Sequence, residues 1–214
     1  MAGFEKVNIT AEVFVRLIFT SEENFKHLKV KQEWGDNIQQ MSMEKFREFF
    51  NEINQMEKES LNLKKYEKLK GLDFYDLAYT YSKRVILLHN VNVIGEIKIL
   101  NAPRFDEMGW IVCLDSNFGN INIENSKIRG ETSAYKFAGC TTGDIKIYKS
   151  TVGDFEFVNC GIAKEKDSRI EILESQTGYF QFRDCKVGKI RIHRRSKTGY
   201  FRVDIGSEIE GFEL

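Results

Sequence analysis

The sequence has very little proline and no hydrophobic run long enough to cross a bilayer. Pro103 is the single proline among 214 residues, and the longest apolar stretch, 13–19, is interrupted by Arg16. A membrane span needs about 20 predominantly apolar residues, so we expect neither a transmembrane helix nor a membrane partner. No basic segment followed by a long apolar run opens the chain, so we predict no secretion signal and a cytoplasmic location.

Net charge and paired cysteines are also missing. Lys and Arg number 32, as do Asp and Glu, which gives zero net charge. That balance argues against a dedicated nucleic-acid coat and against an acidic mimic of nucleic acid. No CxxC pair occurs, so neither a zinc site nor a redox motif is indicated, and a reducing compartment is expected. The four cysteines are Cys113, Cys140, Cys160 and Cys185.

Residues 1–82 are predicted to form a mainly helical N-terminal domain. Apolar side chains recur on one helical face between charged residues, and Ser42 precedes them as a candidate N-cap. We interpret this face as core packing, with a partner-binding helix face as the alternative. Gly71 is a candidate helix stop, and a further short helix is predicted over 72–81. For residues 1–20, strand and helix both remain open. The face residues are Phe46, Phe49, Phe50, Ile53 and Met56.

Residues 83–214 repeat a unit of about ten residues. The unit is Gly-x-Φ-x-Φ-x-x-small, where Φ is apolar, and it is clearest as GDIKIYKS at 143–150 and GDFEFVNC at 153–160. Repeats of this kind predict a solenoid. The glycines are interpreted as turn positions at which a positive φ is useful. A weaker copy lies at 83–90, insertions of about four residues fall near 104–108, 131–134 and 164–167, and one extra residue lies near Ser196.

Alternate units carry different side chains, which indicates a true repeat of about twenty residues. One set has isoleucine pairs followed by serine, and the other has aromatic pairs followed by cysteine. In a β-solenoid, equivalent residues of successive coils lie about 4.8 Å apart and stack as ladders. The expected outward ladders are Lys146, Glu171 and Arg191 on one face and Lys136, Glu156, Gln181 and Arg202 on the other. The expected inward pairs are Ile121/Ile123, Ile145/Ile147, Ile170/Ile172 and Ile190/Ile192, and Tyr135/Phe137, Phe155/Phe157, Phe180/Phe182 and Phe201/Val203.

A finer period of five appears within the units, as in IKIYK, STVGD, FEFVN and CGIAK over 145–164. This pattern resembles the pentapeptide-repeat family over about residues 85–206, although two of four sides carry large apolar pairs and insertions interrupt the period. The resemblance implies a right-handed, four-sided β-helix with twenty residues per turn; a bactofilin-like β-helix is the second candidate. We therefore predict an α+β fold: a mostly helical N-terminal region capping a right-handed parallel β-solenoid of about five 20-residue coils.

No catalytic constellation emerges from the repeats. Asp144 and Asp154 hold the same place in consecutive half-coils, so we expect them on different sides, with Arg169 and Tyr179 stacked beside them. The three histidines are scattered, and the cysteines are interpreted as small buried fillers. We predict no enzyme activity, no cofactor and no metal site, and keep a β-helix carbohydrate-active enzyme as a weaker alternative.

A basic surface is predicted near the C-terminal end, where residues 183–202 hold eight Lys or Arg and one Asp. A solvated solenoid face is the simpler interpretation. The functional one is a binding surface for a phosphate backbone or for an acidic protein patch. The candidate binding residues are Lys186, Lys189, Arg191, His193, Arg194, Arg195, Lys197 and Arg202.

Solenoid ends expose unpaired backbone groups and must be covered. The helical half is expected to cap one end, and 206–214 to close the other through Ile209, Phe212 and Leu214. An end-to-end homodimer is the alternative, and the family resemblance also implies it.

Rigid solenoids usually bind large partners. The leading hypothesis is therefore a non-catalytic protein-binding adaptor, or an inhibitor of a larger intracellular machine such as one that processes nucleic acid. The proline-poor composition, rich in Lys, Ile, Asn and Glu, resembles products of AT-rich bacterial or phage genomes, so a phage or mobile-element origin belongs to this hypothesis. The alternative is an accessory protein that contacts RNA or DNA through residues 183–202.

Overall fold

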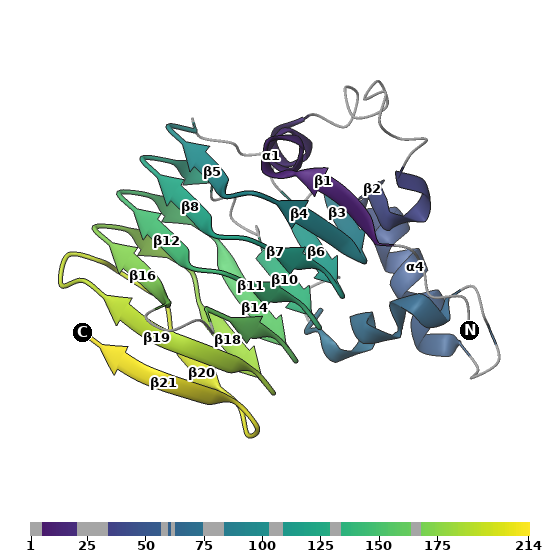
Figure 1. The fold of residues 1–214 in the computed structure, drawn as a ribbon. Coiled ribbons are helices and arrows are strands. Elements are labelled where there is room, and N and C mark those ends of the chain that lie inside the picture. The colour runs from purple at the N-terminus through teal and green to yellow at the C-terminus, as the bar shows by residue number, and fades with distance from the viewer. Residues whose placement is uncertain are drawn as a thin grey trace.

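The structure is a computed structural model that describes residues 6–20, 34–56, 60, 63–74, 84–102, 109–128, 134–163 and 168–214. Its strands pair in parallel with strands one coil away, which builds a β-solenoid of about five turns (Figure 1). One coil runs through β10 (Ala134–Ala138), β11 (Thr141–Thr142), β12 (Ile145–Tyr148) and β13 (Thr151–Val152). Each such coil has two longer and two shorter sides. The predicted parallel solenoid is confirmed.

The first long side is a sheet in the order β2 (Ile38–Ser42), β3 (Arg84–His89), β6 (Trp110–Leu114), β10, β14 (Asp154–Val158), β18 (Phe180–Arg183) and β20 (Phe201–Val203). The second long side holds β5 (Ile97–Leu100), β8 (Ile121–Glu124), β12, β16 (Arg169–Leu173), β19 (Lys186–Ile192) and β21 (Glu208–Glu213). One short side holds β1 (Val7–Thr10), β4 (Val91–Ile94), β7 (Asn117–Phe118), β11 and β15 (Gly161–Ile162); the other holds β9 (Lys127–Ile128), β13 and β17 (Gln176–Thr177). Since β19 turns the corner, it joins the second long side to the first short one.

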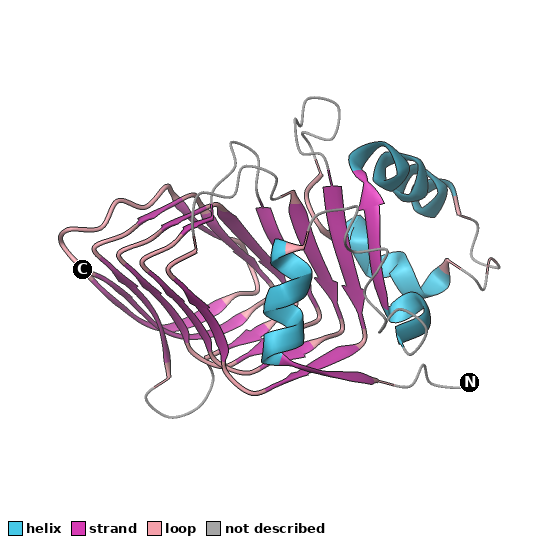
Figure 2. Cartoon of the chain, turned by 90° about the horizontal axis from the view of Figure 1, so that it is seen from above, coloured by secondary structure: helices cyan, strands magenta, loops and turns pink. Residues whose placement is uncertain are grey.

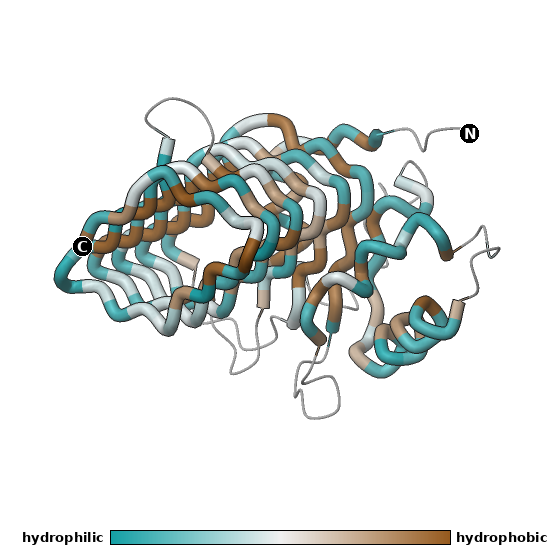
Figure 3. The backbone as a smooth tube through the Cα atoms, turned by 90° about the horizontal axis from the view of Figure 1, so that it is seen from below, coloured by the Kyte–Doolittle hydropathy of each residue, from teal (hydrophilic) through white to brown (hydrophobic). Residues whose placement is uncertain are grey.

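The inward side chains stack as the alternating repeat predicts. Ile145 lies in register between Ile121 and Ile170. On the first long side, the Phe155 ring stacks on Tyr135 at 4.7 Å and on Phe180 at 4.9 Å between centroids. Hydrophobic residues therefore follow one another from coil to coil in continuous rows (Figure 3). This buried interior is the main core of the protein.

The length of the coil differs from the predicted twenty residues. Ala134 pairs with Asp154, twenty positions on, but Trp110 pairs with Ala134, 24 positions on. The extra residues fall in 103–108, 129–133 and 164–167, which lie outside the described residues. The first repeat is also shifted by one residue from the predicted alignment, since Val85 pairs with Trp110.

The serine and cysteine ladders are confirmed, and they also carry hydrogen bonds. The Ser126 amide donates to Ser150 Oγ at 3.0 Å, and the Ser150 amide donates to Ser175 Oγ at 3.1 Å. On the opposite corner, the Cys140 amide donates to the Cys160 sulfur at 3.4 Å. Each small side chain thus satisfies a buried backbone amide of the preceding coil, which ties successive coils together.

The prediction of a mostly helical N-terminal cap needs correction. Two strands of this region, β1 and β2, join the solenoid sheets, and β2 pairs antiparallel with β3. The end itself is covered by α1 (Ala11–Phe19), which begins at the N-cap Thr10 (Figure 2). Its side chains Phe14, Leu17 and Ile18 are buried in the solenoid core. For residues 11–19 the sequence left strand and helix as alternatives, and the structure has a helix because its apolar face closes the solenoid interior.

The other helical segments that the structure describes lie along the outside of the first long side. They are η1 (Gly35–Asn37), α4 (Met43–Gln55) and η2 (Lys64–Gly71). Ser42 caps α4 by accepting from the Lys45 amide at 3.3 Å, which confirms the predicted N-cap. Phe46 is fully buried against Trp110 of β6, at 6.3 Å between ring centroids. The predicted boundary at residue 82 and most of the predicted helix over 72–81 lie outside the described residues.

The predicted closing segment 206–214 forms one more rung instead of a plug. Its strand β21 pairs in parallel with β19, and Ile209 lies beside Val187. Phe212 and Leu214 remain 48% and 84% exposed, so the interior is not sealed by them. No helix among the described residues is both long and apolar enough to cross a membrane.

Candidate binding surface at the C-terminal coil

Exposed apolar side chains concentrate on the last coil. The rungs β20 and β21 end their sheets, and among the described strands each pairs on one side. Among the described residues, five of the seven large apolar side chains that are exposed belong to this region; the other two are Ile94 and Leu100. We call these five residues the C-terminal end surface: Tyr200, Val203, Ile205, Phe212 and Leu214.

The structure divides the predicted basic patch. Lys186, Lys189 and Arg191 lie on β19, and His193, Arg194, Arg195 and Lys197 follow at the next corner. Arg202 lies on β20, in the other long side, and is therefore apart from the rest. The outward ladders predicted from the repeat already placed Arg191 and Arg202 on different faces, and the register of their strands agrees.

Acidic side chains neutralise much of this patch. Arg191 lies 3.5 Å from Glu213, and Lys186 lies 3.8 Å from Glu208. The hydrogen bond from Arg202 at 2.9 Å lowers the pKa of Asp204 below its usual range. Two exposed cations, Arg194 and Lys197, form no ion pair with the part of the chain that the structure describes. The local positive charge is thus smaller than the sequence count suggests.

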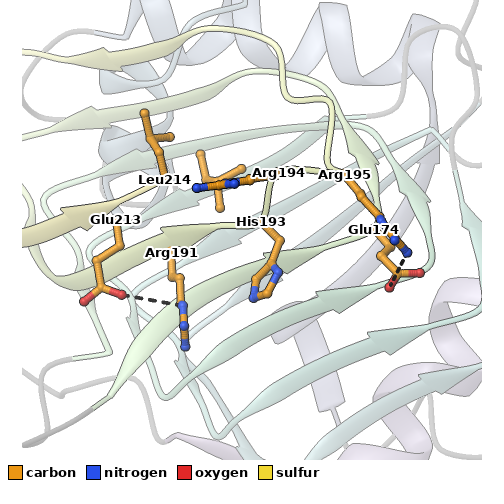
Figure 4. A pocket seen from close by; sticks show the side chains of 8 residues that line it. Glu174, Arg191, His193, Arg194, Arg195, Glu213 and Leu214 are labelled. Carbon is orange, nitrogen blue, oxygen red and sulfur yellow. Dashed lines mark ion pairs between the residues drawn. The ribbon is translucent and has the colours of Figure 1, made fainter.

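A shallow pocket of about 420 Å³ gathers the corner residues beside the end of β21. Figure 4 shows Arg191 joined to Glu213, and Arg195 joined to Glu174, by ion pairs that flank His193. The lining mixes three arginines, one histidine and two glutamates with apolar side chains. The arrangement suits contact with a mixed protein surface better than enclosure of a small molecule.

Asp144 and Asp154, which begin two of the repeats, stabilise the fold by accepting backbone hydrogen bonds from the next coil. Asp144 Oδ1 accepts the Arg169 amide at 2.9 Å, and Asp154 Oδ1 accepts the Tyr179 amide at 3.0 Å. Their predicted stacking neighbours are confirmed, and the carboxylates lie on different sides of the coil. Within the described ranges, no group of three or more His, Cys, Asp or Glu side chains is arranged to hold a metal ion.

One buried charged cluster was missed by the outward-ladder prediction. Lys136 and Glu156 do point out of the coil, but residues 73–74 cover them, and both are almost fully buried. The Glu156 carboxylate accepts from Lys136 Nζ at 2.6 Å and from the Asp73 amide at 2.7 Å. This cluster fastens the N-terminal region to the solenoid, so it is a structural contact and not an open site.

The cysteine thiols should be unreactive in the folded protein. Cys113 and Cys160 are buried, and burial raises the pKa of Cys113 well above its ordinary value. A hydrogen bond with Cys140, together with burial, raises the pKa of Cys160 to about 12. Because the thiolate is the reactive form, we expect Ellman's reagent at pH 8 to label no thiol until guanidinium unfolds the chain. Rapid labelling of the native protein would contradict the buried ladder.

Comparison with protein-family models, curated proteins and solved structures finds no match to this chain.

Proposed function

We propose that this protein is a non-catalytic binding protein that engages a protein partner through the C-terminal end surface. The observation that carries the proposal is the concentration of exposed apolar side chains on the last coil. These side chains lie beside β20 and β21, each of which pairs with one described strand and leaves its other edge open to pairing. Exposed apolar patches rimmed by polar residues mark interaction sites, and free strand edges are templates for pairing. The role of adaptor or inhibitor of a larger intracellular machine, in bacteria or phage, is part of this proposal.

The charge distribution favours a protein over nucleic acid as the partner. Phosphate contacts need cations that are free to replace counterions. In the patch, Arg191 and Lys186 already lie beside Glu213 and Glu208. A few anchors, chiefly aromatic and arginine side chains, dominate the binding energy of protein interfaces. The end surface offers the exposed rings of Tyr200 and Phe212, beside Ile205, which is 99% exposed.

Charged substitutions at the end surface should abolish partner binding. We expect Ile205→Asp combined with Phe212→Asp to weaken capture of the partner from host extract at least tenfold, since each anchor contributes about 1–2 kcal/mol. Ile94→Asp combined with Leu100→Asp is the matched control, because these apolar residues are also exposed but lie on an early coil. Hydrogen exchange of the captured complex should show new protection in 201–203 and 208–213.

Two results would contradict the proposal. One is capture that survives the end-surface substitutions but fails after the control substitutions. The other is capture that is lost in moderate salt and after Arg194→Glu, with the apolar variant unaffected; that result would favour the nucleic-acid alternative.

A further inference from the structure

Over the last four rungs of the second long side, the outward residues alternate in charge from coil to coil. Lys146 of β12 pairs in register with Glu171 of β16, and Glu171 pairs with Arg191 of β19. Arg191 lies 3.7 Å from Glu171 and 3.5 Å from Glu213, its register partner on β21. Opposite charges on neighbouring strands stabilise a sheet, and like charges destabilise it. Arg191 therefore has an acidic neighbour on each side, whereas Glu213 has its basic neighbour on one side.

All charged side chains of the last rung are acidic. Residues 203–214 contain four Asp or Glu and no Lys or Arg. At the other end of β21, an acidic residue again pairs with a basic residue of the preceding coil: Glu208 lies 3.8 Å from Lys186. Inward, Phe212 continues the column of Ile170 and Ile190 and is half exposed. A strand added to this edge would thus complete the rung with apolar side chains inward and a cation beside Glu213.

We propose that the edge of β21 accepts an extended strand of a partner protein in which apolar residues flank a Lys or Arg. This inference rests on the proposed function and specifies the chemistry of its partner. The strand's backbone would pair with the edge of β21, as β21 itself pairs with β19. Its Φ-Lys-Φ or Φ-Arg-Φ segment would place the apolar pair beside Phe212 and Leu214, and the cation beside Glu213.

A second copy of this chain fits the edge poorly. Two copies joined through β21 would bring acidic strands together, which is unfavourable. Two described edge strands carry the required pattern, Ile97-Lys98-Ile99 of β5 and Phe201-Arg202-Val203 of β20. The first is packed against α1, which covers the N-terminal end of the solenoid. In the second, Arg202 is already paired with Asp204, to which it donates at 2.9 Å. The edge is therefore better matched to a different protein than to a copy of itself.

Two synthetic peptides can test, on the full-length chain, whether the edge of β21 prefers a strand with a cation between two apolar residues. The first has the sequence of residues 143–150, GDIKIYKS, which carries the required Ile-Lys-Ile. The second is the same peptide with Lys146→Glu. Titrated into the ¹⁵N-labelled protein, the first peptide should shift the amides of β20 and β21 and bind about fivefold more tightly than the second. Equal affinity, or shifts confined to other strands, would overturn the proposal.

A charge reversal on the protein provides a second test of the proposal. Glu213→Lys should reverse the preference, so that the Glu peptide becomes the tighter ligand. Glu52→Lys, an exposed position on α4, is the matched control and should leave the preference unchanged. A preference that persists in Glu213→Lys would overturn the assignment of Glu213.

The outcomes also separate this inference from the proposed function. If neither peptide binds, yet Ile205→Asp with Phe212→Asp still abolishes partner capture, the protein-binding function stands and strand addition is rejected. If the Lys peptide binds β21 but partner capture is insensitive to the end surface, the proposed function fails instead. A stable dimer with protected β21 amides, seen by light scattering and hydrogen exchange, would show that a second copy occupies the edge and overturn the heterologous partner.

Discussion

Replacing Phe157 with alanine should lower the free energy of unfolding by about 3–5 kcal/mol, the range measured when a buried phenylalanine is truncated in a core that cannot collapse. Phe157 is fully buried, and its ring stacks on Phe137 at 5.0 Å and on Phe182 at 5.5 Å. The two neighbours are held on separate strands whose spacing is fixed by backbone hydrogen bonds. Neither can move into the space, so the cavity persists and the contacts of both rings are lost.

Phe201→Ala is the matched control at the end of the neighbouring aromatic column. Phe201 is partly exposed, stacks on Phe180 at 5.1 Å and meets Phe212 edge-on at 5.5 Å, and no described strand pairs with β20 on its outer side. Its truncation should cost about 1–2 kcal/mol, since the site opens toward solvent. Chemical denaturation followed by circular dichroism measures both values. Equal losses for the two variants would show that the interior ladder does not carry the stability.

The stacking of the interior could be predicted because it depends on the order of the residues alone. Once the period of an alternating repeat is recognised, the register of Ile121, Ile145 and Ile170 follows, and the structure confirms it. The coil length could not be predicted as well. Insertions leave the strand register intact while lengthening the coil between Trp110 and Ala134 to 24 residues.

The glycines show a second limit of sequence interpretation. They were expected at corners with positive φ, and Gly95 does have φ 96°, but most residues in that conformation are not glycines; Asn159, with φ 52°, is one example. Asparagine tolerates the left-handed region better than most residues. Gly109 is required for a different reason: a Cβ atom there would overlap the carbonyl oxygen of Arg84 on the adjacent coil. Close approach between coils is a tertiary property that the spacing of glycines does not reveal.

The candidate site was located by sequence but not characterised by it. Composition places the cations of residues 183–202 in one segment. It does not show that Glu208 and Glu213, which follow much later in the chain, return to lie beside Lys186 and Arg191. The same return of the chain turns a predicted apolar plug into an edge strand, because β21 pairs in parallel with β19 and does not fold over the interior.

The buried pair Lys136–Glu156 gives the second large predicted effect. Lys136 Nζ lies 2.6 Å from Glu156, donates to the Asp73 carbonyl, and lies 5.2 Å from the Trp110 ring centroid. Glu156→Gln preserves size and can still accept the Asp73 amide, but it leaves the Lys136 ammonium buried without its counter-ion. Removing one partner of a buried ion pair costs about 3–5 kcal/mol, and we expect a loss near 3 kcal/mol.

Glu171→Gln is the control for charge alone, because Glu171 occupies the corresponding outward position on the second long side. Its ion pair with Arg191, at 3.7 Å, is partly exposed to solvent and should contribute less than about 1 kcal/mol.

Adding Lys136→Met to Glu156→Gln should recover much of the lost stability, since the uncompensated charge is then gone. In Glu156→Gln, amide exchange over residues 63–74 should accelerate before the solenoid opens, because this pair anchors that segment to β10 and β14. If Glu156→Gln and Glu171→Gln lowered the free energy of unfolding equally, the buried pair would contribute no more to stability than a solvent-exposed ion pair.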